Sequence, residues 1–127
     1  MFTVTAFVAK SFAEVDQPKV RVIENLLTAF KPMGLLWDSA ERAEIESVSQ
    51  KVQKMISERD VFVGVFTHRH PIYAPKNGLK GHYQALLGKR TIEGWTCPPW
   101  LLQESGYALA LQRRLILFRE LGVEISR

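Results

Sequence analysis

An almost unbroken apolar run, Val61-Phe62-Val63-Gly64-Val65-Phe66-Thr67, restricts the folds open to this chain more than any other feature. A strand with one face in water alternates apolar and polar residues, whereas a strand covered on both faces is apolar throughout. The run has the length of a strand and is too short for a typical buried helix. It therefore predicts a central strand of a parallel sheet with helices on both faces.

The segments around this run alternate between strand and helix patterns. Short β-branched, aromatic or aliphatic stretches predict further strands at Phe2–Ala9, Leu35–Trp37 and Leu115–Phe118. Apolar residues that recur every three or four positions predict helices at Gln17–Phe30, Ala40–Arg59 and Pro98–Gln112. Strands and helices that alternate with short links form right-handed βαβ units. The expected fold is a flavodoxin-like α/β three-layer sandwich with a central parallel sheet.

The size and composition of the chain favour a single soluble domain. Its 127 residues are 46% hydrophobic and 24% charged, an ordinary globular balance. The first residues, MFTVTAFVAK, do not have the pattern expected of a leader, no apolar run reaches the about 20 residues that a membrane helix needs, and the lone Cys97 excludes an internal disulfide. We therefore expect a cytoplasmic domain, residues 1–127, with no membrane contact and with Cys97 as a core filler. Because Gly122–Ser126 begins at most one more strand, the domain is expected to belong to a longer protein.

The segment from His68 to Cys97 is the longest connection and carries the excess positive charge. This segment contains five Lys and Arg residues and a single acidic residue, Glu93, and the net charge of the whole chain is +4. Compact domains seldom keep such a connection unless it is a binding loop or an insertion. We interpret 68–97 as a basic insertion loop, with one helical turn at Gln84–Leu87, that holds phosphates or an anionic partner. A solvated surface loop is the alternative; the local charge argues against a nucleic-acid-binding surface.

Several polar and aromatic residues follow predicted strands. Lys10, Ser11 and Phe12 follow the first strand and Asp38 follows the second, while the basic loop follows the third. Ligands of open α/β sheets bind beyond the carboxyl ends of the strands. This rim is therefore the expected binding site. Lys10 and Ser11 would hold ribose or phosphate oxygens, and the candidates for stacking on a base are Phe12, Trp37, Tyr73 and Trp95.

Glu104 is the one carboxylate in the apolar part of the last predicted helix, on the face that also carries Trp100. An aromatic neighbour removes water from a carboxylate, which raises its pKa and strengthens its interaction with a developing positive charge. Such a group suits the cleavage of an N-glycosidic bond, whose transition state resembles an oxocarbenium ion. The structural alternative is a carboxylate that pairs with Lys10, Arg113 or Arg114, or that reaches solvent.

Three motifs carry a resemblance to a known family. The opening "AFVAKSFAEVD" resembles the strand, Ser and Asp that begin TIR domains, and "RDVFVGVF" is similar to a strand that these domains share with nucleoside 2-deoxyribosyltransferase-like proteins. The segment "PPWLLQESGYALALQRRLILF" resembles the Trp-x-x-x-Glu helix of bacterial NAD-cleaving TIR domains. Its Glu-Ser-Gly-Tyr-Ala core is equally similar to the Glu-x-Gly-x-Ala helix of the deoxyribosyltransferases.

The TIR resemblance implies an NAD glycohydrolase that releases nicotinamide, with NAD as substrate and no cofactor. Glu104 would be the catalytic residue. It further implies activation by homo-oligomeric TIR–TIR contacts and coupling to a separate sensor, as in anti-phage defence effectors. The residues assigned to substrate binding are Lys10, Ser11, Phe12, Asp38, Trp95 and Trp100. The chain departs from the family in its long 68–97 loop and in lacking a C-terminal helix.

Two other functions stay open. One is a non-catalytic TIR-type interaction module that works by assembly, and the other is a nucleoside deoxyribosyltransferase or nucleoside hydrolase. No metal site is expected, because His68 and His70 lack a third ligand. Asp60 is expected to orient the third strand, and Gly106 to allow close packing of the last helix on the sheet.

Overall fold

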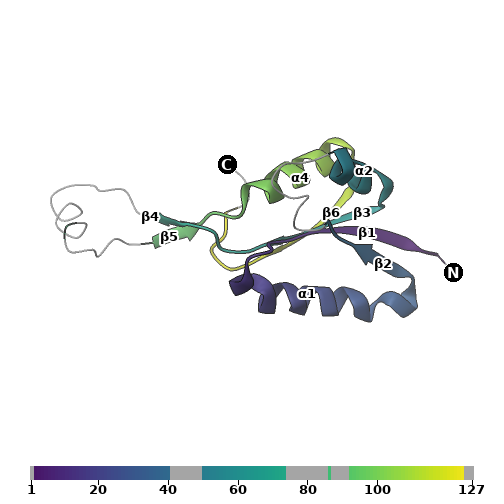
Figure 1. Cartoon of the computed structure of the whole chain (residues 1–127), viewed down its shortest axis with the longest axis horizontal. Coiled ribbons are helices and arrows are strands. Elements are labelled where there is room, and N and C mark those ends of the chain that lie inside the picture. The colour runs from purple at the N-terminus through teal and green to yellow at the C-terminus, as the bar shows by residue number, and fades with distance from the viewer. Residues whose placement is uncertain (1, 41–49, 74–85, 87–91, 125–127) are drawn as a thin grey trace.

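A computed structural model describes residues 2–40, 50–73, 86 and 92–124. Its centre is a parallel sheet with the strand order β2-β1-β3-β6 (Figure 1). The strands are β1 (Val4–Ala9), β2 (Leu35–Asp38), β3 (Val61–Phe66) and β6 (Arg114–Arg119). All three pairings between neighbouring strands are parallel. The predicted flavodoxin-like α/β fold is therefore confirmed.

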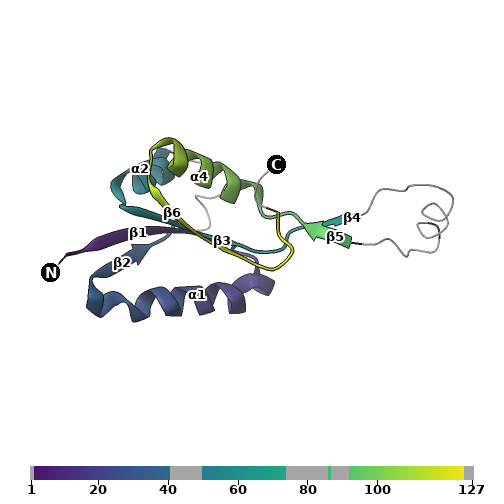
Figure 2. The same ribbon diagram turned by 180° about the vertical axis from the view of Figure 1, so that it is seen from behind.

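Helices cover both faces of the sheet. One face carries α1 (Gln17–Ala29), and the other carries α2 (Gln50–Glu58) and α4 (Pro99–Ala110), as Figures 1 and 2 show from opposite sides. Two short 3-10 helices, η1 (Glu14–Asp16) and η2 (Lys31–Met33), flank α1. The helix predicted at 40–59 is confirmed at 50–58, and 41–49 lie outside the described residues. None of the described helices has the length and apolar character that a bilayer crossing demands.

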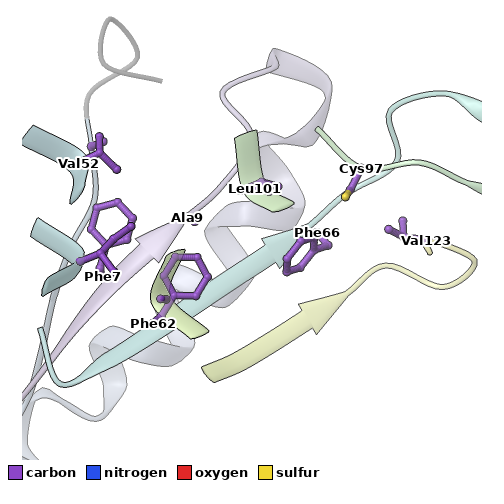
Figure 3. Close-up of a cluster of buried hydrophobic side chains, with 11 residues drawn as sticks. Phe7, Ala9, Val52, Phe62, Phe66, Cys97, Leu101 and Val123 are labelled. Carbon is purple, nitrogen blue, oxygen red and sulfur yellow. The ribbon is translucent and has the colours of Figure 1, made fainter. Parts of the chain in front are cut away.

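Residues of β3 divide the core into two clusters. Phe62 and Phe66 point to the side of α2 and α4, where they join Phe7 and Leu101 (Figure 3). The rings of Phe7 and Phe62 stack there with centroids 6.0 Å apart. The alternate residues Val63 and Val65 belong to the second cluster, together with Val20 and Leu27 of α1. Both faces of β3 are thus buried, which explains why its sequence is apolar throughout.

Two local features set where neighbouring strands of this sheet begin. Gly34 ends η2 at φ +100°, and a Cβ there would lie 2.1 Å from the backbone oxygen of Phe2, so only glycine allows β2 to start beside β1. Asp60 accepts hydrogen bonds from the backbone N–H and the hydroxyl of Thr5, at 2.9 and 3.2 Å. These bonds hold the pKa of Asp60 below its usual value. Asp60 therefore aligns the start of β3 with β1, in the orienting role that its position predicts.

The connection from His68 to Cys97 contains strands that the sequence reading did not predict. β4 (Pro71–Tyr73) and β5 (Ile92–Trp95) form an antiparallel ribbon that leads away from the main sheet (Figures 1 and 2). The helical turn expected at Gln84–Leu87 lies outside the described residues except for Leu86. The described part of Gly122–Ser126 adds no strand to the main sheet, because Val123 forms only an isolated bridge with Trp95. Cys97 is buried in the core, as expected.

Candidate functional site

Glu104 lies on the buried face of α4. The residues of this face are Leu101, Glu104, Ser105 and Ala108. Leu101 and Ala108 belong to the core cluster on the α2 and α4 side of the sheet. Glu104 lies between these two along the helix and is only 2% exposed. The sequence thus places a carboxylate between the apolar Leu101 and Ala108 on the buried face of the helix.

This carboxylate has no partner among the described residues. The three basic residues proposed as partners are engaged elsewhere or exposed. Lys10 pairs with Glu24 at 3.0 Å, Arg113 donates to the backbone oxygen of Ser57 at 2.8 Å, and Arg114 is exposed on β6. Burial without a compensating charge raises the pKa of Glu104 to about 7. Near neutral pH the group therefore exchanges between its charged and neutral forms.

Trp100 precedes Glu104 by four residues, which is about one turn or 6 Å along the axis of α4. Its indole Nε1 is buried and has no hydrogen-bond partner among the residues that the structure describes. The guanidinium of Arg69 lies over the Trp100 ring, 5.4 Å from the ring centroid. A cation, an indole and an unpaired carboxylate thus follow one another along one side of α4.

Trp95, one of the predicted stacking residues, already has an aromatic neighbour. Its ring stacks on that of His68, with centroids 4.5 Å apart and planes 2° from parallel. Trp95 belongs to β5 and His68 follows β3, so this stack joins the ribbon to the carboxyl end of the sheet. One face of the indole is therefore occupied by protein.

Lys10, Phe12 and Trp37 form a separate group that reaches toward α1. The ammonium of Lys10 lies 5.6 Å from the centroid of Phe12 and 5.9 Å from that of Trp37, and it pairs with Glu24 of α1. The indole N–H of Trp37 donates to the Thr28 hydroxyl at 3.1 Å. These contacts stabilise the junction of β1, β2 and α1. Lys10, which was predicted to bind phosphate, is therefore already paired with a carboxylate of the protein.

Ser11 and Asp38 are likewise bonded within the protein. The buried Ser11 hydroxyl donates to Asp16 at 2.6 Å, and Thr67 donates to the same carboxylate oxygen at 3.1 Å. Asp38 forms a two-point ion pair with Arg59, one bond of which measures 3.0 Å. Ser11, Asp16 and Thr67 connect the carboxyl ends of β1 and β3. Neither Asp16 nor Thr67 was predicted as a site residue, although both follow the end of a strand.

Gly106 does not have the packing role that the sequence suggested. A Cβ at this position would meet nothing within 4 Å, so the residue faces open space. The face of α4 that packs on the sheet is defined instead by Leu101, Ser105 and Ala108. The prediction was wrong because a helical residue two positions after Glu104 points to a different side of the helix.

The described residues also form a hollow of about 310 Å³ on the α1 face of the sheet. Its lining comes from α1 and from the ends of β3 and β6: Lys19, Ile23, Val65, Phe66, Thr67, Phe118, Arg119 and Glu120. Lys19 and Glu120 form an ion pair at this site. The hollow does not include Glu104. No group of three or more potential metal ligands occurs in the part of the chain that the structure describes.

Among the residues predicted to form the site, Trp100 and Glu104 lie one turn apart on α4, and Arg69 lies over the Trp100 ring. Lys10, Ser11 and Asp38 each have a protein partner instead. Arg69 was predicted only as one of the basic residues of the 68–97 loop, because the sequence does not show that its side chain meets Trp100. Comparison with protein-family models, with curated proteins and with solved structures finds no significant match to this chain.

Proposed function

We propose that the chain is a TIR-like NAD glycohydrolase in which Glu104 is the catalytic residue. The observation that carries this proposal is a buried carboxylate on α4 that has no described partner and lies one helical turn from the indole of Trp100. An isolated charged carboxylate in an apolar site costs several kcal/mol relative to a paired or solvated one. A residue retained at such a cost is a functional-site candidate. The resemblance of the Trp-x-x-x-Glu helix supplies the reaction class.

Cleavage of NAD needs a carboxylate but no general acid, because the nicotinamide leaving group does not have to be protonated. The bond between the ribose C1′ and the nicotinamide nitrogen breaks, and its electron pair leaves with nicotinamide, which departs neutral. Positive charge develops on the ribose, and the Glu104 carboxylate stabilises it. Water then adds to C1′ and releases a proton, so that NAD and water give nicotinamide, ADP-ribose and H⁺. No protonated leaving-group donor is required.

The pKa of Glu104 determines which form of the enzyme reacts. Only the ionised carboxylate stabilises a cation, and the pKa is raised to about 7. The rate for free enzyme and NAD is therefore expected to rise with pH through this range and to level off above it. Because Glu104 is nearly inaccessible, binding of NAD must displace side chains that cover it.

The test is release of nicotinamide from NAD by concentrated protein, with Glu104→Gln and Glu104→Ala beside the wild type. Glu14→Gln is the matched control, since Glu14 is exposed on η1. We expect both Glu104 variants to lose turnover by at least a hundredfold while the control retains it, with all proteins folded by circular dichroism. Concentrated and chemically crosslinked samples include any activity that depends on assembly. Equal turnover by wild type and Glu104→Ala would exclude this mechanism.

A non-catalytic assembly module is the second candidate. The observation that favours it is that Lys10, Ser11 and Asp38 are bonded to Glu24, Asp16 and Arg59 and not free to hold a substrate. This function predicts concentration-dependent oligomers without turnover of NAD. A parallel incubation with nucleosides distinguishes the third possibility, because a nucleoside hydrolase or deoxyribosyltransferase releases free base and leaves NAD intact.

A further inference from the structure

We propose that Arg69 is the residue that binds the phosphates of the substrate and thereby makes the site selective for a nucleotide over a nucleoside. The inference rests on the proposed function, because it assigns the substrate class of the Glu104 site.

Backbone hydrogen bonds join Arg69 and His70, just before β4, to Thr96, just after β5. The N–H of Arg69 donates to the backbone oxygen of Thr96 at 2.7 Å, and the N–H of Thr96 donates to His70 at 2.8 Å. Successive residues of an extended chain point to opposite sides. His68 accordingly stacks on Trp95, whereas Arg69 extends over Trp100 of α4. The fold therefore holds the backbone that carries the guanidinium, and the guanidinium itself lies over Trp100.

Arg69 has no carboxylate partner in the described part of the chain. Several other basic residues of the described chain do have carboxylate partners: Lys10 pairs with Glu24, Lys19 with Glu120 and Arg59 with Asp38. The contact of Arg69 with Trp100 is a cation–π interaction, which is not a hydrogen bond and so does not engage the guanidinium N–H groups with an acceptor. Arg69 is exposed, so an anion can reach those donors.

The geometry suits a phosphate group in particular. A guanidinium presents its donors as a planar fork that matches two phosphate oxygens, and an aromatic ring beneath it restricts its orientation. Trp100 lies under Arg69 and one helical turn from Glu104. A substrate whose glycosidic carbon approaches Glu104 would therefore extend its phosphates toward Arg69. This role was expected of Lys10, which is already paired with Glu24.

The test compares a substrate that has phosphates with one that has none. The variants Arg69→Gln and Arg69→Lys are made in the full chain, with Arg21→Gln as the control, since Arg21 is exposed on α1 at the opposite face of the sheet. Nicotinamide release is measured from NAD and from nicotinamide riboside. We expect Arg69→Gln to lower kcat/KM for NAD by about tenfold to a hundredfold, mainly through KM, the loss typical of a charge-assisted hydrogen bond. The value for nicotinamide riboside should change less than twofold.

Two further results distinguish the residue from a merely structural one. Arg69→Lys keeps the charge without the fork and should recover part of the affinity, and Arg21→Gln should match the wild type. An equal loss for both substrates, or no loss for either, would overturn the assignment. Thermal melting checks that each variant is folded.

Binding measurements separate this inference from the proposed function. Titration calorimetry with ADP-ribose, on Glu104→Gln and on Glu104→Gln/Arg69→Gln, reports phosphate binding without turnover. A loss of affinity of tenfold or more in the double variant supports Arg69 even if the wild type cleaves nothing, in which case the proposed function alone fails. Cleavage of NAD together with unchanged ADP-ribose affinity overturns Arg69 and leaves the proposed function standing. Absence of ADP-ribose binding to Glu104→Gln also counts against Arg69.

Discussion

The imidazole of His68 and the indole of Trp95 lie face to face, with ring centroids 4.5 Å apart. His68 Nε2 contacts the backbone oxygen of Leu121 at 2.8 Å, and the backbone N–H of His68 donates to Glu120 at 2.9 Å. The N–H of Trp95 donates to the backbone oxygen of Gly122 at 2.9 Å. These contacts join the β4–β5 ribbon to the segment that follows β6. The base of the ribbon is thus a packed part of the fold.

Replacement of Trp95 by alanine should therefore destabilise the whole domain. We expect the free energy of unfolding to fall by about 2 to 3 kcal/mol, because a partly buried aromatic and its stack are lost. Urea unfolding followed by circular dichroism measures this change. Ile92→Ala is the control, since Ile92 is exposed on the same strand and its loss should cost well under half as much. Equal effects of the two variants would contradict the structural role of the stack.

The raised pKa of Glu104 predicts how the stability of the domain depends on pH. The folded state keeps its proton up to about pH 7, whereas the unfolded chain loses it near the ordinary value of 4.5. Between these values the folded state binds more protons, so the contribution of Glu104 to stability is lost as the pH rises. Relative to wild type, Glu104→Gln should gain about 3 kcal/mol between pH 4 and pH 8. Urea unfolding across this range, with Glu14→Gln as control, measures the difference. A constant difference would show that the carboxylate is solvated or paired.

The Asp16 carboxylate should contribute strongly to stability. It accepts hydrogen bonds from the hydroxyls of Ser11 and Thr67, and all three residues are buried. Asp16→Ala leaves two buried donors without an acceptor, which should cost about 2 to 4 kcal/mol of unfolding free energy. The exposed Glu14, two residues earlier, is the control, and its alanine variant should change stability by less than about 0.5 kcal/mol. Similar thermal midpoints for the two variants would contradict the network.

Two glycines should respond to alanine in opposite directions. A Cβ at Gly106 meets open space within α4, so Gly106→Ala should stabilise the domain by about 0.5 to 1 kcal/mol through helix propensity. A Cβ at Gly64 would lie 2.6 Å from the ring of Phe66 and 3.1 Å from Leu117, so Gly64→Ala should destabilise by about 1 to 3 kcal/mol. Thermal unfolding measures both. Destabilisation by Gly106→Ala would restore the close-packing role that its sequence position suggested.

The sheet could be predicted from the sequence because its signals are local. The apolar run at 61–67 and the three-and-four spacing in 17–30 each report burial of a contiguous segment. The four strands of the main sheet and the helices α1 and α4 accordingly begin and end within two residues of the predicted boundaries. The ribbon was missed because β4 has three residues and β5 four, and strands so short lack a period that can be recognised.

The candidate site could be predicted only in part. Glu104 and Trp100 share one helix, so their spacing alone places them together. The partners of Lys10, Ser11 and Asp38 depend on which side chains meet after folding, and a sequence does not report those pairings. Arg69 was overlooked for the same reason, because it meets Trp100 only when the chain beyond β3 lies against α4.

The edge strand β6 has a consequence for how the protein behaves at high concentration. Its side chains Ile116 and Leu117 are exposed, and an open edge of this kind is a template on which strands of other molecules assemble. Arg114 and Arg119 stand at the two ends of the strand. Were β6 to pair antiparallel with its own copy in full overlap, arginine would face arginine at both ends, which is unfavourable. The two arginines are thus expected to disfavour this pairing, and neutralising them should make the protein more prone to associate through β6.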